Sequence, residues 1–228
     1  MNQTDNAVKA SLFVTCIIDQ FFPEVGEAAV RVLRRLGVDV EFDQSQTCCG
    51  QPAFNSGDWK SGRKVARHTA SIFGGDLPVI VPSGSCAAMN FHGNRLQFEE
   101  EPDEAVESLS NRTWELMDFI VNGLGVTEWE GSLENPTKIA FHHSCHSRGT
   151  KTGEATTQLL QSIENVELVS FAPPPTPVPQ PPGNPAPERK FLAIIKTFVF
   201  DEAAITDGPL HSPTQSPSYF FRVVVTLN

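Results

Sequence analysis

The stretch Cys48-Cys49-Gly50 constrains this chain more than any other part of the sequence. Adjacent Cα atoms lie about 3.8 Å apart across a trans peptide, which is below the usual range of about 4.4–6.8 Å for a disulfide. A disulfide between the two cysteines would therefore be strained. On a turn, both sulfurs can instead point at one ligand, and Gly50 permits the left-handed backbone that such a turn requires.

Two more cysteines complete a set of four. Thirty-one residues separate Cys16 from Cys48, and 36 separate Cys49 from Cys86. Four thiolates are the number that a [4Fe–4S] cluster normally takes. Zinc accepts the same four thiolates, although the close cysteine pairs usual at structural zinc sites are absent. A third interpretation is that the four are buried structural thiols.

Short apolar stretches alternate with stretches of helical periodicity. The pattern predicts strands at residues 11–16, 38–42, 77–81, 138–141 and 166–171, and helices at residues 23–37, 58–73, 103–123 and 154–163. This rhythm is typical of an α/β fold with a largely parallel sheet and flanking helices. Each cysteine follows an expected strand, and the carboxyl ends of parallel strands meet at one edge. We therefore expect Cys16, Cys48, Cys49 and Cys86 to converge there.

The charge of the chain limits its partners. The formal net charge is −10, and residues 1–171 carry 13 Lys/Arg against 23 Asp/Glu. Such a surface repels phosphate, so neither nucleic acid nor an anionic membrane is expected as a partner. No membrane span and no secretory signal are visible in the sequence. Five cysteines without an export signal favour a reducing compartment, and we expect a cytoplasmic protein.

The character of the chain changes after residue 171. Residues 173–187 contain nine of the 18 prolines, which predicts an extended linker over residues 172–190. Residues 191–228 form an unassigned, β-prone tail. Within it, residues 191–200 and 219–227 are expected either to pair as a hairpin or to lie against a sheet edge. Residues 1–171 are expected to form the cysteine-rich α/β domain.

Several stretches resemble the cysteine-rich CCG-domain family, in particular the branch of lactate utilization protein A and the glycolate oxidase iron–sulfur subunit, which is related to the cysteine-rich part of heterodisulfide reductase. The matching stretches are residues 13–16, 19–26, 34–38, 46–57, 82–89 and 143–146. The resemblance covers roughly residues 10–171, and the stretch around Cys48-Cys49-Gly50 is its most specific part.

The family carries two copies of its cysteine motif in two pseudo-repeated halves, and this chain departs from that pattern twice. Cys86 has no CXXC partner, since Ser83 lies three residues before it and Met89 three residues after it. Cys145 resembles the first cysteine of the second copy, but no further cysteine follows it. The resemblance therefore implies a fold whose second half is incomplete, and the gene product is interpreted as truncated, frame-shifted or fused.

By this resemblance the chain is an iron–sulfur electron-transfer subunit of a lactate or glycolate oxidation system that works with partner subunits. Cys16, Cys48, Cys49 and Cys86 are the expected ligands of an iron–sulfur cluster of the [4Fe–4S] type, and Cys145 is a further candidate cofactor residue. No catalytic residue is assigned. Two alternatives stay open: a zinc-stabilised scaffold without redox turnover, and an inactive fragment. The roles of Cys145 and of its neighbours His142, His143 and His146 are also open.

Overall fold

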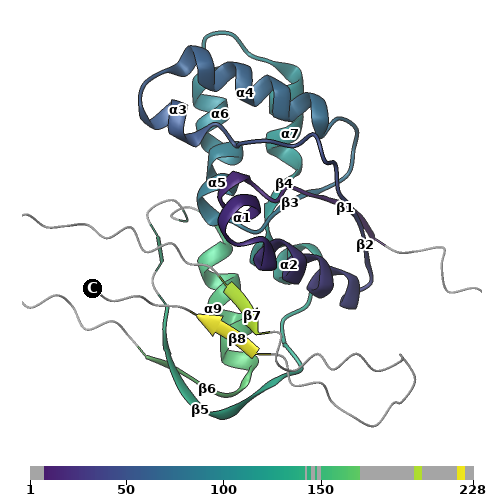
Figure 1. The fold of residues 1–228 in the computed structure, drawn as a ribbon, viewed down its shortest axis with the longest axis vertical. Helices are drawn as coiled ribbons and strands as arrows, with labels where there is room; N and C mark the ends of the chain where they lie inside the picture. The colour runs from purple at the N-terminus through teal and green to yellow at the C-terminus, as the bar shows by residue number, and fades with distance from the viewer. Residues whose placement is uncertain are drawn as a thin grey trace, which may run out of the picture.

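A computed structural model describes residues 8–141, 143–144, 147, 150–169, 198–201 and 220–223. Its larger sheet has four strands in the order β2-β1-β3-β4, and all three pairings are parallel (Figure 1). The strands are β1 (Val8–Leu12), β2 (Val38–Glu41), β3 (Val79–Val81) and β4 (Thr113–Glu115). An α/β fold with a parallel sheet is thus confirmed.

Helices connect each strand to the next. Between β1 and β2 lie α1 (Cys16–Phe21) and α2 (Pro23–Arg35); between β2 and β3 lie α3 (Gln51–Asn55) and α4 (Trp59–Ile72). Between β3 and β4 lie α5 (Gly84–Ala88), the π-helical turn η1 (Met89–Gly93), α6 (Asn94–Gln97) and α7 (Glu104–Arg112). After β4 come α8 (Leu116–Asp118) and the π-helical turn η2 (Phe119–Gly123). Among the described helices, none is long and apolar enough to cross a membrane.

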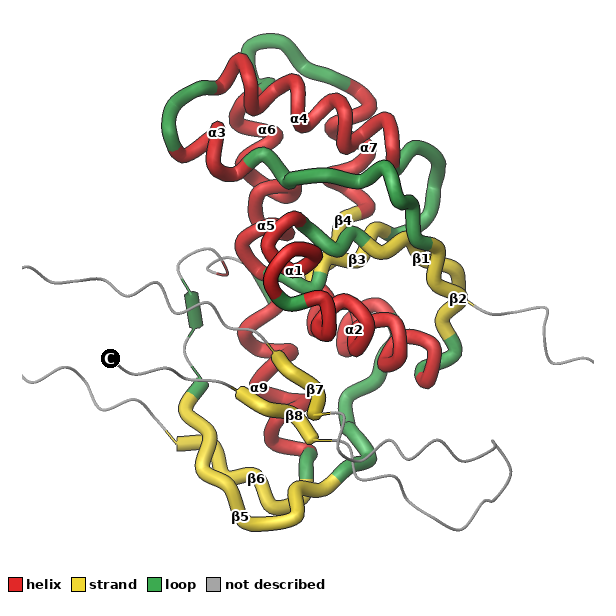
Figure 2. Tube along the Cα trace, viewed as in Figure 1, coloured by secondary structure: helices red, strands yellow, loops and turns green. Residues whose placement is uncertain are grey.

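Neighbouring residues of the sheet feed two separate cores, because successive side chains of a strand point to opposite faces. Leu12 packs into one core with α2, η2 and α9 (Thr152–Ser162), whereas Phe13 packs into the other with α4, α5 and α7. On β3, Ile80 joins the first core and its two neighbours join the second. Figure 2 shows the resulting layers, with α4 and α7 on one side of the sheet and α2 on the other.

The second part of the fold is smaller. Among the described residues, β5 (Ser132–Ala140) and β6 (Glu164–Val169) form a separate parallel pair, and α9 connects them. Their register shifts between Ser132 and Thr137, a segment that contains Pro136, which has no N–H to donate. A third pair, β7 (Phe198–Asp201) and β8 (Phe220–Val223), is antiparallel, as the hairpin alternative expected. The rest of the proposed linker and tail lies outside the described residues.

The single helix expected over residues 103–123 is wrong. The helix ends at Arg112, and the next three residues pair with β3 as strand β4. The guanidinium of Arg112 donates to the carbonyls of Leu77 (2.6 Å) and Phe73 (2.7 Å), which fixes the chain beside the entry to β3. Tertiary pairing here overrides the local helical pattern, and the buried carboxylate of Glu115 then caps a new helix at the N–H of Met117 (2.8 Å).

A close approach at Gly62 gives a test of the packing around α4. A Cβ added to Gly62 would clash with Oε1 of Gln97, a fully buried side chain that donates to Asn94 (3.1 Å). Helix propensity alone predicts that Gly62→Ala stabilises the protein by about 1 kcal/mol. We expect the opposite, a loss of about 1–3 kcal/mol from overpacking.

Urea denaturation followed by circular dichroism measures this change. Gly74→Ala is the control, because an added Cβ there meets only a carbonyl oxygen at 3.8 Å. If Gly62→Ala is as stable as wild type or more so, the carboxamide of Gln97 is free to move and the packing argument fails.

Candidate metal centre

Three loops at one edge of the larger sheet carry the four cysteines. Cys16 is the first residue of α1, which follows β1. Cys48 and Cys49 lie between β2 and α3, and Cys86 lies within α5, which follows β3. Because β1 is the central partner of β2 and β3, its loop lies between the other two.

The structure brings the four thiol groups together. The Sγ atoms of Cys16 and Cys48 are 3.6 Å apart. The thiol of Cys49 makes side-chain hydrogen bonds with both Cys48 and Cys86. Cys49 and Cys86 are buried, whereas Cys16 and Cys48 are half-buried. The sulfurs therefore form one connected group that runs from the protein interior to its surface.

Gln46 holds two of these loops in register. Its side-chain oxygen accepts a hydrogen bond from the N–H of Val14 (2.7 Å), and its amide nitrogen donates to the carbonyls of Leu12 (3.2 Å) and Asp43 (2.8 Å). One carboxamide thus links the end of β1, which leads to Cys16, with the loop that leads to Cys48. The sequence pattern pointed to Gln46 only as a neighbour of the cysteines.

Backbone geometry sets the direction of the vicinal pair. Gly50 has φ 87°, the left-handed conformation expected from the sequence. Its N–H donates to Sγ of Cys48 at 3.4 Å. The N–H of Gln51 similarly bonds to the sulfur of Cys49. The turn therefore directs two N–H groups at the two sulfurs.

Hydrogen bonds between the thiols separate them into two donors and two acceptors. Burial, with the hydrogen bond to Cys48, raises the pKa of Cys16 to about 11. The hydrogen bonds that it donates to Cys48 and Cys86 raise the pKa of Cys49. The bond from Cys49 is the largest cause that lowers the pKa of Cys48 to about 5 and that of Cys86 to about 6. At neutral pH, Cys48 and Cys86 are thus thiolates.

Three hydroxyl groups also surround Cys86. The side chains of Ser83, Thr15 and Ser85 hydrogen-bond to its sulfur and add to the lowering of its pKa. Sequence reasoning placed Ser83 near the site but missed Thr15 and Ser85. Their one signal was that each directly precedes a cysteine.

The donor set fits an iron–sulfur cluster by its chemistry. Four thiol groups converge, and the buried hydroxyl oxygen of Thr15 has no partner at conventional hydrogen-bond geometry, so the site holds a polar group in search of an acceptor. The sulfurs are in mutual hydrogen-bonding contact, and within the described ranges no group of three or more His, Cys, Asp or Glu side chains is arranged to hold a metal ion. Uptake of a cluster therefore requires that the sulfurs separate.

The other expected residues lie elsewhere or outside the described part of the chain. Cys145, His142 and His146 are among the residues that the structure does not describe. The ring of His143 packs edge-on against Phe141, with centroids 4.9 Å apart, and it contacts Gly153 at the start of α9. Nothing in this geometry assigns His143 a ligand role.

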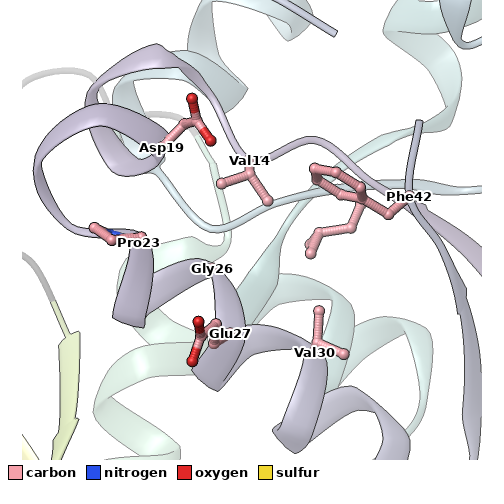
Figure 3. Close-up of a pocket in the computed structure, with 8 residues that line it drawn as sticks. Val14, Asp19, Pro23, Gly26, Glu27, Val30 and Phe42 are labelled. Atoms are coloured by element: carbon pink, nitrogen blue, oxygen red, sulfur yellow. The ribbon is translucent and has the colours of Figure 1, made fainter. Parts of the chain in front are cut away.

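A pocket of about 220 Å³ lies beside α1, and no described cysteine lines it. Its walls come from Leu12, Val14, Asp19, Pro23, Gly26, Glu27, Val30 and Phe42. Figure 3 shows apolar side chains together with the carboxylates of Asp19 and Glu27. The pocket is therefore separate from the thiol group, and its two acids disfavour an anionic ligand.

The fold and the cysteine loops define a CCG-type cysteine-rich protein, and residues 10–89 match the family model "CCG: Cysteine-rich domain". "Lactate utilization protein A 2" of Bacillus cereus (strain Q1) is 40% identical over 164 residues, which are 71% of this chain and 67% of the relative. "Lactate utilization protein A" of Halalkalibacterium halodurans is 42% identical over 164 residues, 71% of this chain and 66% of the relative. The chain belongs to the lactate utilization protein A family.

Glu115 lies at the same sheet edge and predicts a pH-dependent stability. Complete burial raises its pKa to about 7, against the opposing hydrogen bonds from the N–H groups of Asp118 and Met117. The folded protein therefore binds a proton that the unfolded chain releases near its ordinary pKa of 4.5. This contribution is fully present below that value, falls as the pH rises toward about 7, and is then lost.

The variant Glu115→Gln isolates this effect, because it keeps the shape of the side chain and removes its titration. We expect the wild-type free energy of unfolding to fall relative to the variant by about 2–4 kcal/mol between pH 5 and pH 8. Denaturation of the reduced, metal-free protein at several pH values measures the difference. A difference that is constant with pH contradicts the prediction.

Proposed function

We propose that this protein is an iron–sulfur electron-transfer subunit of a lactate-oxidising system. The observation that carries the proposal is the convergence of four thiol groups from three loops at one sheet edge. Membership of the lactate utilization protein A family supports it. We propose Cys16, Cys48, Cys49 and Cys86 as the ligands of a [4Fe–4S] cluster.

A bound cluster supplies one-electron transfer through thiolate-held iron. The protein contributes thiolates at Cys48 and Cys86, and it loses the thiol protons of Cys16 and Cys49 when metal binds. Burial of Cys49 and Cys86 keeps water from one side of the site. The half-buried Cys16 and Cys48 face the surface at which electrons would be exchanged with a partner.

We further propose that a partner protein, and not this chain, binds and oxidises lactate. No Gly-rich phosphate loop follows a strand in the sequence, so a flavin or nicotinamide site has no support here. The acidic pocket beside α1 disfavours a carboxylate substrate. We choose lactate over glycolate because the relatives are named for lactate. Free thiols in the site favour the cytoplasm, a reducing compartment.

Iron content tests the ligand assignment. Protein purified without oxygen is expected to contain iron and sulfide and to show a visible absorption band that dithionite bleaches. Cys48→Ala removes one of four ligands and should lose most of the iron. Cys145→Ala is the matched control, because it removes the one cysteine outside the proposed four, and it should keep the iron.

Two results would count against this assignment. Bound zinc in place of iron, with no bleaching by dithionite, supports the alternative of a zinc-stabilised scaffold. Full iron content in Cys48→Ala shows that the cluster lies elsewhere. Circular dichroism of the metal-free variants controls for misfolding.

Growth on lactate tests the role in the cell. In a bacterium whose own lactate utilization protein A genes are deleted, expression of this chain is expected to restore growth on L-lactate. Cys48→Ala should not restore it at equal protein level. If the wild-type chain binds a cluster in vitro but fails to restore growth, its partner or substrate differs from the proposed one; growth on glycolate alone would assign the substrate to glycolate.

A further inference from the structure

Thr15 occupies a position where its hydroxyl has an ordinary local role that it does not perform. It is the N-cap residue of α1, where a threonine side chain normally accepts a hydrogen bond from an N–H of the first helical turn. Here the side chain makes no such bond. The residue is only 2% exposed, and its hydroxyl oxygen has no partner at conventional geometry. A buried hydroxyl left in this way is costly and therefore calls for a reason.

Ser83 repeats this behaviour at a second helix. It is the N-cap residue of α5, and its side chain also makes no capping hydrogen bond. Serine is among the most favourable N-cap residues, so two helices at this edge forgo the same local stabilisation. The two N-caps follow the adjacent strands β1 and β3, which are paired at Leu12 and Ile80.

Both hydroxyls face one atom, the sulfur of Cys86. The side chains of Ser83 and Thr15, together with that of Ser85, lie within hydrogen-bonding reach of this sulfur. Cys86 is buried, so water does not supply these donors. The two helices therefore give up their side-chain caps and present hydroxyl groups to a single proposed ligand.

We propose that Thr15, Ser83 and Ser85 are positioning residues that hydrogen-bond to the sulfur of Cys86 and raise the reduction potential of the cluster held there. The inference rests on the proposed iron–sulfur function. Reduction adds one electron, and part of its negative charge is carried by the ligand sulfurs. Hydroxyl donors stabilise that charge while their protons stay on oxygen, so they favour the reduced form.

Thr15→Val is the first test variant, because it removes the hydroxyl and keeps the size and branching of the side chain. Ser83→Ala removes the second donor. Thr69→Val is the matched control: Thr69 is also buried near the site, but its hydroxyl bonds to the carbonyl oxygens of Val65 (3.0 Å) and Cys48 (3.4 Å) and not to a sulfur. Thr15→Ser restores the hydroxyl without the methyl group.

The readouts are iron content and the reduction potential from an anaerobic redox titration. At a fixed poise near the wild-type midpoint, we expect the ratio of reduced to oxidised cluster to fall about tenfold in Thr15→Val and in Ser83→Ala, and further in the double variant. Thr15→Ser and Thr69→Val should keep the wild-type ratio. Pulsed electron paramagnetic resonance of the reduced wild-type protein should show exchangeable proton couplings that weaken in Thr15→Val.

The outcomes separate the two proposals. If the wild-type protein binds no iron, the proposed function fails and the inference fails with it. If the iron content is full but the potentials of Thr15→Val and Ser83→Ala are unchanged, only the inference fails. An equal shift in Thr69→Val also overturns it, because packing alone would then explain the change. If Thr15→Val loses its iron, Ser83→Ala and the proton couplings of the wild-type protein decide.

Discussion

Parallel pairing of β1 with both β2 and β3 is the constraint on which the cysteine site depends. It brings the carboxyl ends of three strands to one edge, so that residues separated by up to 70 positions, such as Cys16 and Cys86, enter one group of sulfurs. Right-handed β-helix-β connections place the intervening helices on the faces of the sheet and leave this edge free. Gln46 then fixes the relative position of two of the loops.

Much of this arrangement was predictable because it rests on local patterns. The alternation of strands and helices, the left-handed Gly50 and the position of the cysteines after strands all follow from residue type and spacing. The ligand role of the four cysteines stays a prediction, since convergence alone does not identify what they hold. The sequence failed at Thr113, whose strand exists because β3 offers an unpaired edge and Arg112 anchors the chain beside it. No local pattern encodes that contact.

The site also departs from the local rules that hold elsewhere in the fold. Asp58 and Asp103 cap α4 and α7 through their side chains, with bonds to the N–H groups of Ser61 (3.1 Å) and Val106 (3.2 Å). At α1 and α5, residues equally suited to capping do not cap. A sequence that satisfies a rule at two helices and sets it aside at two others, both beside the cysteines, marks the place where function competes with stability.

The exposure of the four sulfurs gives this edge a direction. Cys49 and Cys86 lie in the core formed with α4 and α7, whereas Cys16 and Cys48 are half-buried. The hydroxyl donors gather on the buried end, at Cys86. A change of charge would thus be stabilised in the interior, where fixed dipoles act in a low dielectric, while exchange with a partner would take place beside Cys16. Both ends of such a path are set by how far each loop extends beyond its strand, and α1 begins only four residues after β1 ends.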